Sequence, residues 1–299
     1  MPEERQIGRR STIARLETRV GSAGHQWIVG PRRTGKTSVA KAVLARLRRR
    51  ERVALDFDLS KLQLASARTL AGEIARQAQA AGVGDPKAIG RLRGFAARQR
   101  SSARRLGEAL KDLGFEDEAD ALAVAASVLA AADDGEPGLD EVLRALALHA
   151  RATAQHVFVL LDEVHFLARF PDPEWAVASW CREVDCPIVF LLAGSEESAV
   201  QALRQPGEAL ERIGQEFALG DIATEDWIPG LRDRFAEGGV EIGDRELLQI
   251  VEASGGHPRR TMLIASYVHS AALAQPDRIA SGILVELGIA DACRDRAWT

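Results

Sequence analysis

The feature that most constrains this chain is the stretch HQWIVGPRRTGKTSVAKAVL, residues 25–44. A short apolar run at residues 27–29 predicts a buried strand, and from Ser38 onward apolar residues recur at helical spacing. The turn between them spans Gly30 to Thr37 and fits the pattern G-x-x-x-x-G-K-[ST]. A strand before this pattern and a helix after it are the context expected of a phosphate-binding loop.

Each residue type in this loop has a chemical reason. Gly30 and Gly35 allow backbone angles that a Cβ would penalise, so successive N–H groups can surround a polyphosphate at the start of a helix. Lys36 can reach the β and γ phosphates as a point charge, and the Thr37 hydroxyl can ligate Mg²⁺. The predicted cofactor-binding residues of the loop are Gly30, Pro31, Arg32, Arg33, Thr34, Gly35, Lys36, Thr37 and Ser38.

Composition indicates an ordinary globular protein. Of 299 residues, 46% are apolar and 27% are charged, which suits a soluble chain with a substantial core. Three cysteines without metal-ligand spacing predict reduced thiols, and no apolar stretch reaches the roughly 18 residues of a membrane span. We therefore expect a cytoplasmic protein with no membrane association. A net charge of -4 does not demand a nucleic-acid partner.

Strand-like segments recur along the chain with helical patterns between most of them. Together with residues 27–29 they make five predicted strands, and the central ones are nearly continuous apolar runs, as in a parallel sheet covered on both faces. The predicted class is α/β, a three-layer P-loop NTPase fold with a five-stranded parallel sheet. The other four segments are Val53–Leu59, Val157–Glu163, Ile188–Ser195 and Glu216–Ile222.

The pattern divides the chain into a P-loop domain over residues 1–222 and a small helical domain over residues 223–299. Residues 61–154 are too many for one crossover helix, and we interpret them as a helical insertion. Within it, Arg91–Arg105 contains six arginines, a run that is more often a solvated helix face than a nucleic-acid contact. The helices expected after Ile222 are Glu225–Glu237, Arg245–Ala253, Pro258–Ala274 and Gln275–Leu287.

Polar residues at predicted strand ends supply candidate hydrolytic groups. Asp162 would hold Mg²⁺ and Glu163 would orient and activate the attacking water. Two solvated acids at a strand end are the alternative, which the phosphate loop upstream makes less favoured. Ser195 is a candidate γ-phosphate sensor or an ordinary turn residue. Arg212 is a candidate finger that reaches a neighbouring subunit's phosphate, which would require at least a dimer. His165 is expected to pack beside the site rather than act as a base.

The order of these motifs resembles a known family. IGRR, GPRRTGKTS, VFVLLDE, LLAGS, ERIGQEFALGDI and GGHPRR look like the P-loop ATPases of the AAA+ and STAND group, closest to the archaeal-type ATPase family that also occurs in bacteria. The resemblance covers about Gln6 to Tyr267, and within residues 61–154 it consists only of helical character. It implies ATP with Mg²⁺, and it makes the small helical domain, residues 223–299, an all-helical lid.

The resemblance also implies roles for further residues. Ile7, Gly8 and Arg9 would lie against the adenine, and Pro258 would approach the base from the lid. Arg259 or Arg260 would be the second phosphate sensor. Only some thirty residues follow Tyr267, too few for the winged helix that many relatives carry, so the target would be contacted through the ATPase surface, the insertion or the lid. ATP is favoured over GTP by the resemblance and by the lack of an N-K-x-D motif.

Two functions remain in view. The first is an enzyme, an ATP-hydrolysing, Mg²⁺-dependent switch or motor that binds ATP and ADP, with a second copy of the chain as a candidate partner in a homo-oligomer. The alternative is a DNA-associated helper of replication, transposition or defence whose nucleotide state controls assembly on DNA. Arg91–Arg105 would contact the DNA or a protein partner. A scaffold that binds ATP with little turnover is less favoured, because the hydrolytic groups are all in the sequence. A metabolic kinase is less favoured, because Asp162 and Glu163 together with an all-helical lid favour water as the acceptor.

Overall fold

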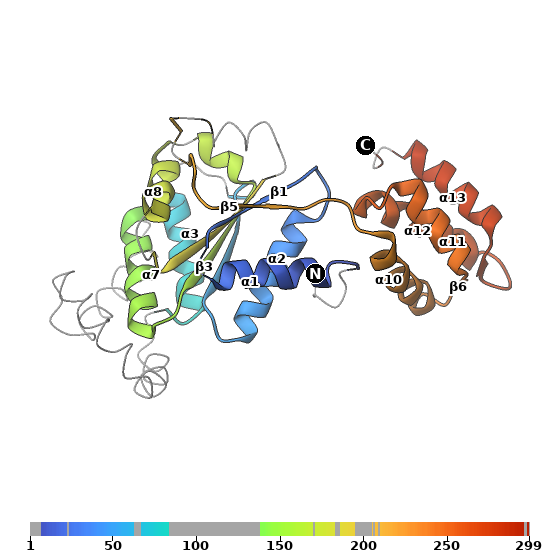
Figure 1. Ribbon diagram of the computed structural model, residues 1–299, viewed down its shortest axis with the longest axis horizontal. Helices are drawn as coiled ribbons and strands as arrows, with labels where there is room; N and C mark the ends of the chain where they lie inside the picture. Colours follow the sequence, from blue (N-terminus) through green and yellow to red (C-terminus); the bar gives the residue numbers. More distant parts are fainter. Residues whose placement is uncertain are drawn as a thin grey trace. The chain divides into compact units, whose positions relative to one another are not determined.

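Figure 1 shows the computed structural model of the chain. The structure describes residues 7–22, 24–62, 67–83, 138–169, 171–182, 186–194, 205, 207–208, 210–295 and 298. Ser195 and the Arg91–Arg105 stretch lie outside the described residues, as does most of the expected insertion. No helix of the described part is long and apolar enough to cross a membrane.

A five-stranded parallel sheet in the order β2-β3-β4-β1-β5 is the centre of the fold. Parallel register joins Asp58 of β2 to Asp162 of β3, and Asp162 to Ala193 of β4, so these strands end at one edge. The fold class predicted from the sequence is confirmed. The strands are β1 (Gln26–Val29), β2 (Ala54–Asp58), β3 (Val157–Asp162), β4 (Ile188–Ala193) and β5 (Gln215–Ala218).

Burial on both faces explains the apolar runs of the central strands. Every residue of β3 and of β4 is buried, including both the odd and the even positions. Val157, Val159 and Leu161 of β3 belong to the core cluster on one face, whereas Phe158 and Leu160 alternate with them and face the other layer. Such strands are expected where helices cover both sides of a parallel sheet.

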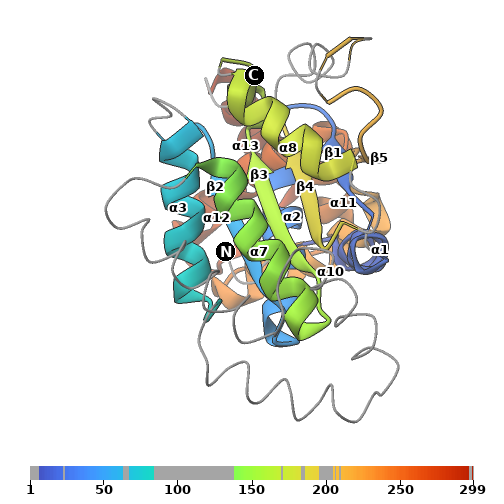
Figure 2. The ribbon, with the colours of Figure 1, turned by 90° about the vertical axis from the view of Figure 1, so that its left-hand side faces the viewer.

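Helices form the two outer layers. α3 (Ala67–Ala80), α7 (Leu139–Thr153) and α8 (Pro171–Arg182) contact one another and lie on the near face of the sheet in Figure 2, with α2 (Lys36–Arg49) behind it. α1 (Arg10–Gly21) is held to α2 by Glu17, which pairs with Arg46 and Arg50. A short 3-10 helix, η3 (Val164–Arg169), follows β3 directly. α3 and α7 are the described ends of the expected insertion.

The C-terminal region is helical, as predicted, but the sequence reasoning missed one element. A parallel pair of two-residue strands, β6 (Glu241–Ile242) and β7 (Ile279–Ala280), joins two of its loops. The last helix also begins later than expected, at Gly282, because a turn in which the Asp277 carboxylate accepts from the Ile279 backbone N–H comes first, followed by β7. The helices are α10 (Thr224–Glu237), α11 (Asp244–Ser254), α12 (Pro258–Leu273) and α13 (Gly282–Arg294).

Chain contacts divide the molecule into two compact units, which we call the loop–lid unit and the sheet unit. The loop–lid unit comprises residues 1–15, 30–39 and 218–299, and the sheet unit comprises residues 16–29 and 40–217. The C-terminal helical region, for which we keep the name lid from the prediction, has its own core, in which Trp227, Leu231 and Ile264 are fully or almost fully buried. The glycine-rich loop therefore belongs to the same compact unit as the lid helices.

Candidate functional site

The glycine-rich loop adopts a conformation that only glycine permits at its first position. β1 ends at Val29 and α2 begins at Lys36, so the loop lies between the strand and helix that the motif requires. Gly30 has φ +153°, and a Cβ added there would lie 2.2 Å from the Leu219 carbonyl oxygen. Gly35 has φ +91° with open space around it. The two glycines therefore serve different needs, close approach at Gly30 and backbone angle at Gly35.

Lys36 places a cation against the loop backbone. Its residue is buried, and Nζ donates hydrogen bonds to the carbonyl oxygens of Gly30 at 2.8 Å and Pro31 at 2.7 Å. The Thr34 hydroxyl donates to the same Pro31 oxygen at 2.9 Å. An ammonium held in a buried loop at a helix N-terminus favours an anion in that position. Thr37 and Ser38 follow in the first turn of α2 and are partly exposed.

Arg9 joins the loop to the segment that leads into the lid. Its guanidinium donates to the carbonyl oxygen of Thr34 at 3.1 Å and to that of Gly220, and the residue is only 7% exposed. Burial lowers the pKa of Arg9, whereas the nearby carboxylates of Asp221 and Asp226 act in the opposite direction. Arg9 is thus a buried, charge-assisted link within the loop–lid unit.

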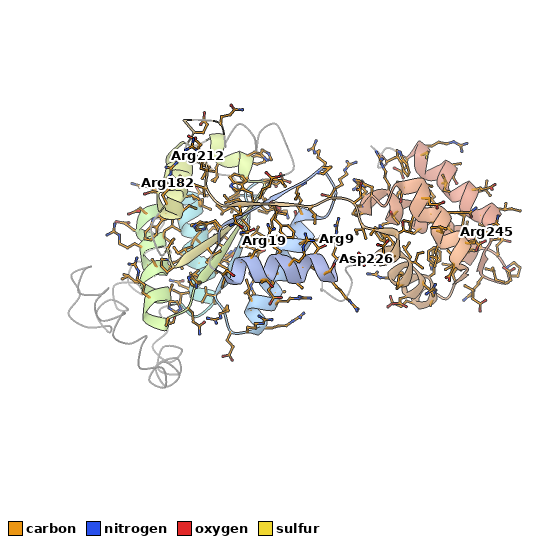
Figure 3. All side chains as sticks on the ribbon, viewed as in Figure 1. Arg9, Arg19, Arg182, Arg212, Asp226 and Arg245 are labelled. Carbon is orange, nitrogen blue, oxygen red and sulfur yellow. The ribbon has the colours of Figure 1, made fainter. Side chains whose placement is uncertain are left out.

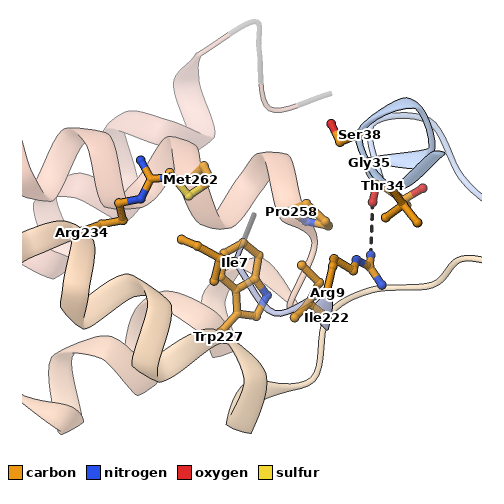
Figure 4. A pocket seen from close by; sticks show the side chains of 11 residues that line it. Ile7, Arg9, Thr34, Gly35, Ser38, Ile222, Trp227, Arg234, Pro258 and Met262 are labelled. Atoms are coloured by element: carbon orange, nitrogen blue, oxygen red, sulfur yellow. Dashed lines mark hydrogen bonds between the residues drawn. The ribbon is translucent and has the colours of Figure 1, made fainter. Parts of the chain in front are cut away.

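An apolar hollow of about 230 Å³ opens between the loop, the N-terminal segment and the lid helices (Figure 4). All its lining residues belong to the loop–lid unit. Trp227 lies on its wall with its indole N–H bonded to the Gly256 carbonyl oxygen at 3.0 Å. A mainly apolar wall with a few polar groups suits a flat aromatic base. The lining is Ile7, Arg9, Thr34, Gly35, Ser38, Val39, Ile222, Trp227, Arg234, Pro258 and Met262.

The turn GGHP brings the start of α12 to the loop. Pro258 is the first residue of α12 and lines the hollow, while His257 caps the helix. Because Nδ1 of His257 accepts from the Arg260 backbone N–H, Nε2 carries the proton and donates to the Arg32 carbonyl oxygen at 3.3 Å. Gly8 is also constrained, since a Cβ there would lie 2.4 Å from Ile222 Cγ2.

Asp162 and Glu163 form the acidic end of β3 in the sheet unit. Asp162 is buried, and its Oδ1 accepts from the Glu163 backbone N–H at 3.1 Å. Asp58 ends the neighbouring strand in register with it. Burial alone would raise the pKa of Asp58, but hydrogen bonds from Lys61 and Ser60 lower it overall. The sequence reasoning missed Asp58, although its position at the end of a predicted strand was a usable signal.

Glu163 has a strained backbone. Its φ is +55°, a left-handed conformation that non-glycine residues seldom adopt, and it turns the chain from β3 into η3. The Nδ1 atom of His165 lies 3.4 Å from Glu163 Oε2, and the His165 ring stacks against Phe166. His165 therefore packs beside the glutamate. This turn sets the direction of the Glu163 carboxylate, so the alternation of side chains along β3 does not determine it.

The remaining predicted groups differ in their surroundings. Arg212 is 90% exposed and its Nε lies 3.0 Å from Glu211 Oε1 (Figure 3). Arg260 packs on the Trp298 ring, 5.2 Å from its centroid, and Nε donates to the Trp298 carbonyl oxygen at 3.3 Å. Arg259 is exposed. Of the two arginines proposed for a sensor, Arg259 is the more accessible one.

The sequence reasoning found the loop side of the hollow but missed much of its lid side. Trp227, Leu231 and Arg234 occupy one face of α10 at spacings of four and three residues, so helical periodicity linked them. Nothing in that pattern distinguishes a pocket wall from a core position. The missed lining residues are Val39, Ile222, Trp227, Arg234 and Met262.

These features define a P-loop nucleotide-binding fold, and comparison with known proteins identifies the family. A family model described as an AAA domain matches residues 19–203, and the chain belongs to this family of P-loop ATPases. The expectation of an ATPase is therefore confirmed. No curated protein matches the sequence. The STAND assignment and the archaeal-type ATPase family stay predictions.

Solved structures share the fold at low sequence identity. The Walker-type ATPase of Pyrococcus abyssi matches with a TM-score of 0.61 and 17% identity, over 96% of this chain and 73% of that one. The ORC1 protein of Aeropyrum pernix, solved in complex with DNA, gives 0.55 and 16%, over 97% and 67%. The RuvB Holliday junction branch migration motor of Thermotoga maritima gives 0.52 and 13%, over 95% and 70%.

Proposed function

We propose that this protein is a Mg²⁺-dependent ATP hydrolase that works as a nucleotide-controlled switch or motor. The observation that carries the proposal is the hollow whose wall combines the loop residues Thr34, Gly35 and Ser38 with lid residues. A base bound there would contact the lid while its phosphates meet the loop. Nucleotide occupancy would then bias the lid, since a ligand shifts an equilibrium by its differential contacts.

The residues would divide the chemistry as follows. Lys36 would turn from the Gly30 and Pro31 carbonyls toward the phosphates, and the backbone N–H groups of the loop would surround them. Thr37 and Asp162 would hold Mg²⁺, which supplies charge neutralisation of the phosphates when bound. Glu163 would accept a hydrogen bond from the attacking water. Asp162 of β3 and Ile28 of β1 both pair with Ala193 of β4, so Asp162 lies at the level where β1 ends, which supports these assignments.

The experiment that tests hydrolysis compares wild type with Glu163→Gln, in which the carboxylate is replaced by an amide of similar size. ATP turnover should fall by about 10²-fold or more, while binding of ATP with Mg²⁺ is retained. Glu286→Gln, an exposed glutamate on α13, is the matched control and should turn over ATP at the wild-type rate. Equal turnover in wild type and Glu163→Gln would remove the glutamate from the mechanism. Tight ATP binding without wild-type turnover would favour a nucleotide-gated scaffold.

We propose two further roles outside the hollow. Arg212, exposed and remote in sequence from the loop, would act on the phosphate of a second copy, so the active form would be an oligomer. Ser195 would sense the γ phosphate. For Arg212→Ala, we expect a lower ATP turnover than for wild type. A mixture of this variant with wild-type protein at equal concentration should still show lowered turnover. Unchanged turnover of Arg212→Ala would remove the argument for an oligomer.

A second candidate function is action on DNA. One structural neighbour, ORC1, was solved in complex with DNA, and another, RuvB, is described as a Holliday junction branch migration motor. Their likeness to this chain is in fold. In this function ATP would control how the protein assembles on DNA in replication, transposition or defence. Stimulation of turnover by duplex DNA would favour it, whereas identical turnover with and without DNA would favour the first candidate.

A further inference from the structure

Basic residues concentrate at the C-terminal end of α2, far beyond what the composition of the chain suggests. The whole protein carries a net charge of -4, yet α2 contains no acidic residue. The end of the helix and the residues after it read RLRRRER, with Glu51 as the single acid. We call this cluster the basic end of α2. It consists of Arg46, Arg48, Arg49, Arg50 and Arg52.

Local structure accounts for part of this charge. Cations at a helix C-terminus are stabilised by the helix dipole, and three of the arginines reach carboxylates. Arg46 and Arg50 share Glu17 at 3.1 and 2.9 Å. Arg48 bonds Asp56 at 2.6 Å and the Ala54 carbonyl oxygen at 2.7 Å. Arg46 and Arg50 therefore share one carboxylate, and these contacts position the guanidinium groups.

Positive charge is concentrated at Arg52 and at a hollow beside it. Within the described residues no carboxylate lies at ion-pair distance from Arg52, which is exposed. The charge of Arg52 also acts on His156, whose pKa is lowered first by burial and then by this charge. A hollow of about 520 Å³ beside them is lined by Arg48, Glu51, Arg52 and Gln77 together with the start of β2. Two cationic groups that line the same hollow are stabilised by a bound anion.

We infer that the basic end of α2 binds the phosphodiester backbone of a nucleic acid. Arginine suits this partner, since its planar guanidinium donates two parallel hydrogen bonds to phosphate oxygens. The inference rests on the second candidate function, action on DNA, and names the surface that would contact it. Backbone contacts of this kind carry no sequence information, so the surface would position the protein on any duplex or single strand.

The surroundings favour a nucleic acid over a membrane or a protein. Protein interfaces are enriched in aromatic side chains, and amphipathic helices that lie on a membrane carry an apolar face beside their charges. Among the described residues, the large apolar side chains that are exposed lie between Leu248 and Leu287, in the loop–lid unit. The basic end of α2 has polar and charged side chains at its surface. Its chemistry matches a polyanion that is recognised by charge.

The test is the salt dependence of DNA binding. Wild type should bind a labelled DNA duplex and a single strand of the same length, with an affinity that falls linearly on a log–log plot against salt. Arg50→Gln/Arg52→Gln removes two phosphate contacts, so we expect the slope to shrink by about 2 and the affinity at low salt to fall roughly tenfold or more. Binding of ATP without DNA should be unchanged.

The control is Arg245→Gln/Arg294→Gln, which removes the same charge from the lid. Arg294 is 79% exposed and pairs with Asp291, as Arg50 is 69% exposed and pairs with Glu17. Arg245, labelled in Figure 3, is exposed like Arg52. This control should keep the wild-type slope. If Arg50→Gln/Arg52→Gln unfolds, Arg52→Gln alone should still lower the slope by about 1.

The possible results separate the inference from the proposed functions. Wild-type affinity and slope in Arg50→Gln/Arg52→Gln would overturn the inference, as would an equal loss in the lid control. Binding that depends on these arginines but is seen only with phosphatidylserine vesicles or polyglutamate would also overturn it. Lack of ATP turnover together with arginine-dependent DNA binding would contradict the hydrolase and leave this surface standing. DNA-stimulated turnover that persists in Arg50→Gln/Arg52→Gln would support the hydrolase and overturn the inference.

Discussion

The two ends of helix α2 are both suited to anions, but they achieve this by different physical means. At the N-terminal end, fixed backbone N–H groups and the buried Lys36 define a small site of set geometry. At the C-terminal end the helix dipole opposes an anion, and exposed arginines must supply the attraction. The first arrangement gives specificity for a polyphosphate. The second gives a long-range attraction that salt screens.

The largest expected effect follows from removing the buried cation of Lys36 at the N-terminal end. Lys36→Ala should weaken ATP binding by about 10²-fold or more, because charge-assisted hydrogen bonds to phosphate are lost in a buried loop. DNA affinity measured without nucleotide should stay at the wild-type level. Calorimetric titration with ATP checks the first part, and anisotropy with labelled duplex checks the second.

Lys41→Ala is the matched control, because Lys41 lies on the same helix and pairs with Asp56 at the surface. Its ATP affinity should equal that of wild type. Loss of DNA binding in Lys36→Ala would contradict the separation of the two ends.

A second effect should come from the glycine at the start of the loop. In Gly30→Ala the new Cβ would clash with the Leu219 carbonyl oxygen, since the two atoms would be 2.2 Å apart. We expect the free energy of unfolding to fall by about 2–4 kcal/mol, as is typical of overpacking combined with backbone strain. Urea denaturation measures it.

Gly35→Ala sharpens this prediction, because Gly35 has a positive φ but open space around the added Cβ. Its cost should be about 1–2 kcal/mol, from backbone strain alone. An equal loss in the free energy of unfolding for both substitutions would mean that the backbone at Leu219 shifts away from the new Cβ at little energetic cost.

The smallest expected effect concerns the other end of α2 and a histidine beside it. Arg52→Gln removes a positive charge that, after burial, is the second cause of the lowered pKa of His156. The pKa of His156 should therefore rise toward its ordinary value without reaching it. Since a lowered pKa keeps His156 neutral in the folded state, folding loses stability as the pH falls below the unfolded-state pKa. That loss should be smaller in Arg52→Gln.

An NMR titration of the histidine ring protons checks this shift. Arg245→Gln serves as the control and should leave the His156 pKa in place, because the shift of that pKa comes from burial and from Arg52. An unchanged pKa in Arg52→Gln would show that burial alone lowers it.

The sequence predicted the sheet better than the lid, and the reason is physical. β3 and β4 are short runs in which every residue is buried, so their composition is dictated by the helices on both faces. β5 ends at Ala218, four residues before the predicted end at Ile222, because the chain there leaves the sheet toward the lid. The lid strands β6 and β7 have two residues each, too few to create a periodic pattern.

The candidate site was predictable where a chemical requirement fixes spacing. Gly30, Gly35 and Lys36 stand at set intervals, whereas the wall formed by Trp227 and Met262 comes from helices brought together by tertiary packing. Such packing leaves no local signature. The same holds for Arg48 and Asp56, since a charge run in a sequence does not reveal which of its members are paired.

The indole of Trp227 has a practical consequence. It is 2% exposed, lines the hollow and is fixed by a hydrogen bond to Gly256. A purine stacked in that hollow would quench its emission, so the chain contains its own optical reporter of occupancy. The signal can be separated from that of the other four tryptophans, among them Trp27 and Trp180 in the core of the sheet unit, by subtracting the spectrum of Trp227→Phe. Nucleotide exchange would then be followed in real time on unlabelled protein.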